Sequence, residues 1–587
     1  MIAHIKKYLP GESLMVIIAA FIGVGAGLVN IVFRSVTELV HETIFIHGRE
    51  WLGIGMGDWH IFLLPLIPMA GMVLLIPLSL LFPGEVNGYG FSNFLRKVNL
   101  EGGILRFRCI PLKIISTALT IGTGGSAGVE GPTAHVGGAL GSQVGQFFRV
   151  SGNRMKVYIA AGCAGAVGAM FNAPIAGVFF AAEIVLLGTY EISSFAALVI
   201  SSAMATVVSR AHYGASPAFQ VPNYHMVNPL AEVPLYIFLG VLVGAVAVLH
   251  IRTFYLIRDR FADLNLHPQL KPIVGGLLVG LIGILFPQVM GDGYAYLEEV
   301  LGGNGTLLIM FLLVFVKIVA TAITLGAGGA GGVFAPALFI GATVGGTFGA
   351  VVHSYFPEVT ATPGAYAAVG IGSFLAASTH APLTGMFLMF EMTGNYLIMI
   401  PVMLASVIGT VVAGRLYHDS IDTVDFTRSG IDIHEGRETA VMKSIKVGKV
   451  IHEDVDFISE DANVDELLQV FRMAGSLYFP VVDDTGRMTG IISMQDVKAI
   501  LHDEELRRSS HVGNICSRNV IVLTPDDNLY TAMTLFDVKG IEEIPVVESE
   551  GNRWVLGMLK RADVISAYNH EVLKRGISEK TASIRLR

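Results

Sequence analysis

The stretch Gly122-Thr123-Gly124-Gly125-Ser126-Ala127-Gly128-Val129-Glu130-Gly131-Pro132-Thr133-Ala134 sets one carboxylate, that of Glu130, among glycines between two apolar segments. Glycine permits tight turns, and Pro132 suits the first turn of a helix, where its missing N–H would be unpaired anyway. A helix start offers unpaired N–H donors and about half a positive charge, so Glu130 and a small anion would compete for one place. The alternative is a packing turn in which Glu130 only caps the helix.

The composition indicates a membrane protein. Hydrophobic residues make up 53% of the 587 residues and charged residues only 15%, with 68 glycines. Several apolar runs, such as Leu14–Phe33 and Leu307–Leu325, are long enough for a span of about 20 residues, so we expect roughly ten or more helices, some broken by glycine and proline. Three cysteines, Cys109, Cys163 and Cys516, lie far apart, which argues against a disulfide framework or a metal cluster.

The membrane region contains an internal repeat. Its halves share paired residues at nearly constant spacing, namely Pro132 with Pro336, Pro174 with Pro382, and Glu183 with Glu391. The first pair is 204 residues apart and the other two are 208 apart. In transporters such repeats often have inverted topology, with the binding site at their interface built from broken helices. Gly332-Val333-Phe334-Ala335-Pro336 would then be a second helix start, and we expect Glu391 to pair with backbone or a basic neighbour.

These residues resemble the CLC family of chloride channels and proton-coupled chloride transporters. Gly128–Pro132 is similar to that family's Gly-Arg-Glu-Gly-Pro motif, and Gly332–Pro336 to its Gly-Ile/Val-Phe-Ala-Pro motif. The resemblance implies an α-helical polytopic membrane protein, a CLC-type inverted repeat of broken helices, with voltage gating. It implies that Glu130 is the gating glutamate, which occupies an anion site when ionised and leaves it when protonated or displaced. It also implies that Gly131, Val333 and Phe334 line the anion site.

Three positions depart from the family pattern. The family's Gly-Ser-Gly-Ile-Pro motif falls on Gly88-Tyr89-Gly90, so a tyrosine replaces the coordinating serine and chloride preference over another halide or nitrate stays open. The family's pore-lining tyrosine falls on Asp422, with Tyr417 close by, and we assign Tyr417 to the anion site. The glutamate that passes protons on the inner side falls on Ile184, and an isoleucine cannot carry a proton.

The sequence after Val412 is richer in charge and contains a second repeat. Phe479–Asp483 and Gly490–Asp496 are matched by Ile544–Glu548 and Gly557–Asp563, with amphipathic helices expected over 464–474 and 529–538. This pattern resembles a pair of CBS domains, which are cytoplasmic nucleotide-sensing modules. The resemblance makes Asp496 and Asp563 candidates for binding an adenine nucleotide (ATP, ADP or AMP), although Lys560 replaces the usual Ser/Thr of the second copy. The alternative is a CBS pair that serves only as a dimer contact.

The function that these residues favour is passive chloride conduction gated by Glu130 and modulated by the CBS pair, because Ile184 interrupts a proton route. The alternatives are a chloride/proton antiporter and a channel or transporter for another anion, such as fluoride, nitrate or bromide. A CBS-regulated cation transporter is more remote, since it would need several intramembrane carboxylates facing one another. An enzyme would need a nucleophile or metal cluster, and the sequence shows neither.

The expected organisation is a transport domain over 1–425 with repeats over about 14–210 and 235–418, a linker over 426–440, CBS copies over 441–502 and 503–570, and a tail over 571–587. Basic residues at Lys6, Lys7 and the cluster Arg96, Lys97, Arg106, Arg108 and Lys113 favour the cytoplasmic side. We therefore expect a multi-pass protein of the cell membrane with a cytoplasmic CBS tail. Its expected partners are a small anion, membrane lipid and, from the resemblance, a second copy in a homodimer. We expect neither nucleic acid nor a metal as a partner.

Overall fold

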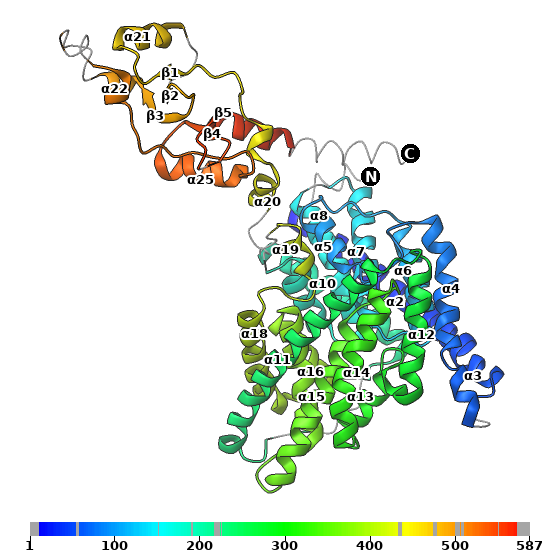
Figure 1. Cartoon of the computed structure of the whole chain (residues 1–587). Coiled ribbons are helices and arrows are strands. Elements are labelled where there is room, and N and C mark those ends of the chain that lie inside the picture. Colours follow the sequence, from blue (N-terminus) through cyan, green and yellow to red (C-terminus); the bar gives the residue numbers. More distant parts are fainter. Residues whose placement is uncertain are drawn as a thin grey trace. The chain divides into compact units, whose positions relative to one another are not determined.

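The computed structural model describes residues 11–54, 58–150, 152–188, 192–216, 224, 226–431, 437–473, 478–498, 505, 510–549 and 551–571. The chain forms two compact units, Met1–Thr427 and Arg428–Arg587, which are described separately below (Figure 1). Lys6 and Lys7, residues 432–436 of the expected linker and residues 572–587 of the expected tail lie outside the described residues.

The first unit is helical and apolar. Within the described residues, seven helical stretches are long and apolar enough to cross a membrane. Three further apolar helices, Cys109–Gly122, Pro174–Val185 and Leu270–Leu285, have 10–17 residues each. Each of these helices is shorter than the about 20 residues that a full crossing takes. The expectation of broken helices is therefore confirmed.

The helices of the first unit occur in two sets with the same order. The first set begins with α2 (Gly11–Val40) and the second with α11 (Pro229–Asp263). The remaining helices match in pairs: α4 (Leu66–Leu81) with α12 (Leu270–Leu285), α5 (Phe91–Asn99) with α13 (Tyr294–Leu301), α6 (Cys109–Gly122) with α14 (Leu307–Gly326), α7 (Glu130–Phe147) with α15 (Phe334–Tyr355), α8 (Asn153–Phe171) with α16 (Pro363–Thr379), α9 (Pro174–Phe180) with α17 (Pro382–Thr393), and α10 (Ile192–Tyr213) with α18 (Met399–Leu416). Short elements connect them: η1 (His41–Ile46), α3 (His47–Trp51), η2 (Asp58–Leu63), η3 (Ala181–Val185), η4 (Pro287–Val289), η5 (Tyr396–Ile398) and α19 (Val424–Arg428). Figure 1 shows α14, α15 and α16 side by side in the second set.

Reciprocal hydrogen bonds show that the two sets are related by a local two-fold axis. Ala330 N donates to Thr120 Oγ1 and Ser126 N donates to Thr324 Oγ1, both over 3.0 Å. In the same way, Gly88 N donates to Gly328 O and Gly291 N donates to Gly124 O, both over 3.2 Å. A two-fold interface has this property, because each contact recurs with the partners exchanged. The internal repeat is thus a structural repeat.

A glutamate from each repeat binds the start of a helix in the other repeat. Glu183 accepts hydrogen bonds from Leu383 N (3.0 Å) and Thr384 N (2.7 Å) at the start of α17. Glu391 accepts them from Ile175 N (3.0 Å) and Ala176 N (2.8 Å) at the start of α9. Each carboxylate therefore satisfies N–H groups that its partner helix would leave unpaired inside the membrane. The expectation that Glu391 pairs with backbone is confirmed.

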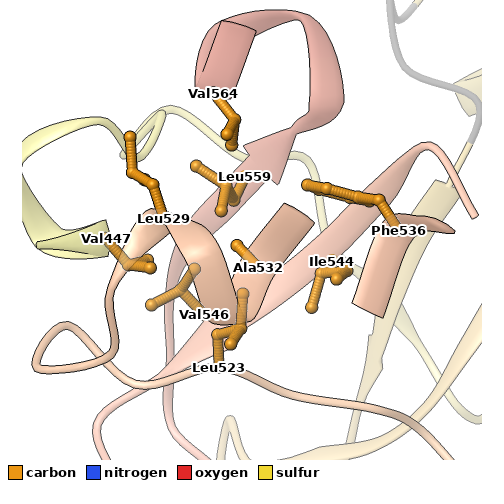
Figure 2. Packing of buried hydrophobic residues seen from close by; sticks show 9 residues of the cluster. All are labelled: Val447, Leu523, Leu529, Ala532, Phe536, Ile544, Val546, Leu559 and Val564. Atoms are coloured by element: carbon orange, nitrogen blue, oxygen red, sulfur yellow. The ribbon is translucent and has the colours of Figure 1, made fainter. Parts of the chain in front are cut away.

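The second unit contains two small sheets with accompanying helices, one for each copy of the second sequence repeat. One copy has a three-stranded sheet in the order β1 (Ile458–Ser459), β2 (Tyr478–Val482), β3 (Met488–Ser493), and the other pairs β4 (Glu543–Val547) with β5 (Val555–Lys560). The other elements are α20 (Arg437–Ser444), η7 (Val447–Lys449), α21 (Val464–Met473), α22 (Met494–Lys498), α24 (Val512–Ile515) and α25 (Leu529–Lys539). The amphipathic helices expected over 464–474 and 529–538 are α21 and α25. Figure 2 shows how Leu529, Ala532 and Phe536 of α25 pack on Ile544, Val546 and Leu559 of the sheet.

Candidate anion site between the repeats

The two glycine-rich loops meet at the interface of the repeats. Gly128 and Gly332 exchange two hydrogen bonds, with Gly128 N to Gly332 O at 2.8 Å and Gly332 N to Gly128 O at 2.7 Å. A Cβ atom on Gly332 would lie 3.1 Å from Gly131 N, so a larger residue would push the loops apart. The glycines therefore allow the starts of α7, at Glu130, and of α15, at Phe334, to come together.

The carboxylate of Glu130 lies at the start of the helix from the other repeat. Its Oε2 accepts a hydrogen bond from Ala335 N at 3.1 Å, within the first turn of α15. Its Oε1 accepts a hydrogen bond from the hydroxyl of Tyr294. Glu130 is only 1% exposed. A negative group thus occupies the place that a helix N-terminus offers to an anion.

Tyr294 was not among the residues singled out from the sequence. It opens α13 after Gly291-Asp292-Gly293, whose counterpart in the first repeat is Gly88-Tyr89-Gly90 before α5. The spacing of 203 residues between Gly88 and Gly291 is the signal that could have revealed this second loop. Tyr294 gives the Glu130 carboxylate a second donor in addition to Ala335 N.

Tyr89 lies in the corresponding loop of the first repeat. Gly88 and Gly90 on either side have φ of +75° and +64°, a conformation that favours glycine. The hydroxyl of Tyr89 donates a hydrogen bond to Asp422 Oδ1. Tyr417, by contrast, follows α18, and its ring centroid lies 5.7 Å from the guanidinium of Arg252. Of the two residues considered for this position, Asp422 rather than Tyr417 therefore contacts Tyr89.

A row of aromatic rings joins the Glu130 end of the site to the Tyr89 end. The ring centroids are 5.8 Å apart from Phe334 to Phe180, 6.2 Å from Phe180 to Phe91, and 6.2 Å from Phe91 to Tyr89. Ile184 follows Phe180 in the η3 turn and is buried. These contacts form one continuous row of rings from Phe334, at the start of α15, to Tyr89, between Gly88 and Gly90.

Two buried lysines contact the backbone of the two loops from matching positions in the repeats. Lys317 in α14 is 0% exposed, and its Nζ donates to Val289 O (3.0 Å) and Gly291 O (3.1 Å). Lys113 in α6 is its counterpart 204 residues earlier, and its Nζ lies 3.1 Å from where a Cβ on Gly90 would be. Lys113 was grouped with basic residues that favour the cytoplasmic side, but it lies within α6 with only 6% of its surface exposed and is therefore no guide to the side of the membrane. Intramembrane cations that face the protein interior favour an anion nearby.

Two cavities border the site at Tyr294, whose hydroxyl contacts Glu130. One has a volume of about 680 Å³ and the other about 360 Å³, and Tyr294 and Asp292 line both. The larger one, here called the vestibule, is also lined by Glu38, Glu42 and Glu299. Its acidic lining disfavours chloride and favours protons, while Tyr294 forms the link from this space to Glu130.

The candidate nucleotide residues of the second unit have protein partners. Asp496 Oδ2 accepts hydrogen bonds from Ser493 N and Ser493 Oγ, both over 2.7 Å. Asp563 Oδ2 lies 3.0 Å from His452 Nε2, and Lys560 Nζ lies 3.7 Å from Glu543. Their role in binding a nucleotide stays a prediction.

An inverted repeat whose glycine-rich helix starts meet around a buried carboxylate defines a membrane anion-transport protein. The sequence pattern of the family described as voltage gated chloride channel matches residues 70–414, and that of the CBS domain matches residues 447–503 and 512–570. The chain belongs to the CLC family and carries a C-terminal CBS pair. Members of this family are transporters or channels, not enzymes.

Several relatives share most of this architecture. The chain is 28% identical to the chloride channel protein CLC-f of Arabidopsis thaliana, across 96% of this chain and 82% of that protein. It is 32% identical to the H(+)/Cl(-) exchange transporter ClcA of Vibrio vulnificus, across 68% of this chain and 86% of that protein. Among solved structures, a slow cyanobacterial Cl−/H+ antiporter matches with a TM-score of 0.65 and 26% identity, across 72% of this chain and 98% of that one.

Proposed function

We propose that this protein exchanges chloride for protons across the cell membrane, with Glu130 as the gate. The observation that carries this proposal is the contact between the Glu130 carboxylate and Ala335 N at the start of α15 (3.1 Å). The same N–H groups can hold chloride once the carboxylate has left. A carboxyl group gives up such donors most readily when it is protonated, so proton binding and anion binding at this place are linked.

Exchange and passive conduction differ in whether protons can pass between Glu130 and the inner side. The passive channel that the sequence favoured rests on Ile184, which is buried and aliphatic; that preference is not confirmed. The relatives named as H(+)/Cl(-) exchange transporters and the cyanobacterial antiporter support exchange more strongly. Passive chloride conduction is therefore the second candidate. Tyr89 in place of the family's serine keeps another anion, such as fluoride, nitrate or bromide, as a variant of either candidate.

Paired fluxes in liposomes test the proposal. An imposed chloride gradient should drive protons against their own gradient through the parent protein, because the two ions are linked at Glu130. Glu130→Gln should lose this proton movement, whereas Glu298→Gln, which changes an exposed acid of α13 that does not line the vestibule, should keep it. Chloride flux without any chloride-driven proton movement in the parent protein would establish passive conduction instead.

We further propose that the second unit is a cytoplasmic nucleotide sensor, and that the protein works as a homodimer in a lipid membrane. A nucleotide shifts a transport equilibrium only if its affinity differs between the two states. Calorimetric titration of the full chain with ATP, ADP and AMP should show binding, weakened more by Asp496→Ala than by Asp563→Ala because Lys560 makes the second motif irregular. Absence of binding at millimolar nucleotide would leave the CBS pair with a structural role.

A further inference from the structure

A second buried carboxyl group lies at the Tyr89 end of the aromatic row that starts at Phe334. Asp422 is 3% exposed and accepts a hydrogen bond from the hydroxyl of Tyr89. Its segment is fixed on both sides, since Ile421 N donates to Ser378 O (2.9 Å) and the hydroxyl of Tyr255 donates to Ile421 O (2.8 Å). The carboxyl group is therefore held against Tyr89 and is not a mobile surface acid.

The charged and titratable groups near Asp422 leave its carboxylate without a cation. Arg258 of α11 forms two hydrogen bonds with Asp425 of α19, at 3.0 and 2.7 Å. Tyr255 of α11 and Tyr89 carry neutral hydroxyl groups. The ammonium group of Lys113 of α6 lies beside the backbone of Gly90. Within the described residues, Asp422 makes a hydrogen bond to Tyr89 and no ion pair. A buried carboxylate without a cation is costly, so its neutral form is accessible.

Two carboxyl groups, each bound by a tyrosine, thus lie at the two ends of this row of aromatic rings. Tyr294 donates to Glu130, and Tyr89 donates to Asp422. The aromatic row from Phe334 to Tyr89 connects these ends. We propose that Asp422 is the inner proton-transfer residue of this protein, taking over the task that Ile184 cannot perform. This inference rests on the proposed exchange function.

The proposed transfer moves one proton between two carboxyl groups. The Asp422 carboxylate takes a proton from hydronium on the inner side, which leaves water, and becomes a neutral acid. Its O–H then gives this proton to water admitted to the pathway, which passes a proton to the Glu130 carboxylate. Asp422 returns to its ionised form and Glu130 becomes neutral, so that Glu130 can release Ala335 N to chloride. No bond other than O–H bonds forms or breaks.

The position of Asp422 also links proton uptake to anion movement. An ionised Asp422 repels an anion that passes Tyr89, whereas a protonated Asp422 does not. An anion nearby in turn favours the protonated form of the carboxyl group. Chloride and a proton therefore favour each other at this end, while at the other end the ionised Glu130 competes with chloride.

The test measures protons moved per chloride in liposomes at fixed external pH and varied internal pH. Asp422→Asn should lower this ratio at least tenfold, whereas Asp422→Glu, which keeps a carboxyl group, should retain coupling with an altered internal pH profile. Asp419→Asn is the matched control, because Asp419 lies on the same segment but accepts a hydrogen bond from Thr427 Oγ1 (2.6 Å). The ratio in this control should equal that of the parent.

The outcomes separate this inference from exchange itself. A parent protein that couples, with coupling lost in Glu130→Gln but kept in Asp422→Asn, overturns the role of Asp422 and leaves exchange intact. A parent protein that moves no protons overturns both. If Asp422→Asn does not fold, an internal pH profile of Asp422→Glu identical to the parent overturns the proposal, and a shifted profile supports it.

Discussion

Replacing Tyr294 by phenylalanine tests whether the Glu130 carboxylate and chloride compete for the start of α15. The hydroxyl of Tyr294 donates to Oε1 of Glu130, while Ala335 N donates to Oε2 at 3.1 Å. A hydrogen bond to a charged group contributes about 1.5–3 kcal/mol. At about 1.4 kcal/mol per factor of ten, its loss lowers the ratio of carboxylate-occupied to vacant sites roughly 10- to 150-fold. Since apparent affinity scales with the fraction of vacant sites, the apparent Kd for chloride should fall by up to that factor.

Calorimetric titration of the purified full chain with chloride measures this effect. Glu130→Ala sets the lower limit of the Kd, because it removes the competitor, and Tyr294→Phe should lie between it and the parent. Tyr296→Phe is the matched control on the same helix: Tyr296 is 7% exposed, and its hydroxyl has no hydrogen-bond partner among the described residues. An unchanged Kd in Tyr294→Phe would refute competition at this place.

Two further predictions concern stability. Glu183→Ala leaves two N–H groups at the start of α17 unpaired, at a cost of roughly 1–3 kcal/mol each, so the thermal unfolding midpoint should fall. The control Glu299→Ala should leave the midpoint unchanged. Equal midpoints for the two variants would contradict the capping role of Glu183. In the second unit, hydrogen bonds from the Thr485 side chain and from Arg487 N hold the pKa of Asp483 below its usual value. Because the folded-state pKa is lowered, this carboxylate stabilises the unit above the unfolded-state pKa of about 4, and the contribution is lost as the pH falls. Asp483→Asn should therefore make denaturant unfolding of this unit less sensitive to acid, and an unchanged acid sensitivity would contradict the assignment.

The internal repeat could be predicted from the sequence, because proline and glutamate residues mark the same helix boundaries in both halves. Pro132 and Pro336 lie in the first turns of α7 and α15, and Glu183 and Glu391 are held by backbone N–H groups across the interface. Buried N–H groups at broken helix ends must find acceptors, so such acids leave a regular pattern. In the second unit, the repeat likewise predicted the amphipathic helices α21 and α25 and the short β-rich runs that form β2, β3, β4 and β5.

The contacts between distant side chains could not be predicted in this way. Tyr89 and Asp422 are separated by 333 residues, and nothing in the local pattern of either residue indicates the other. Tyr417 was preferred at this position as the nearby tyrosine, whereas the structure shows Asp422 in contact with Tyr89 and the ring of Tyr417 beside Arg252. Lys317 is visible in the sequence as a charge inside an apolar run. The backbone carbonyl groups that accept its hydrogen bonds are not visible there, so its contact with the loop before α13 was not predicted.

The reversal potential under a proton gradient tests the central claim most directly. Membranes containing the purified protein are held at fixed, asymmetric chloride while the pH on one side is changed. Exchange predicts that the reversal potential shifts with the proton gradient, because each transport cycle moves both ions, and that Glu130→Gln abolishes the shift. A parent protein whose reversal potential stays at the chloride equilibrium value at every pH would contradict proton-coupled exchange.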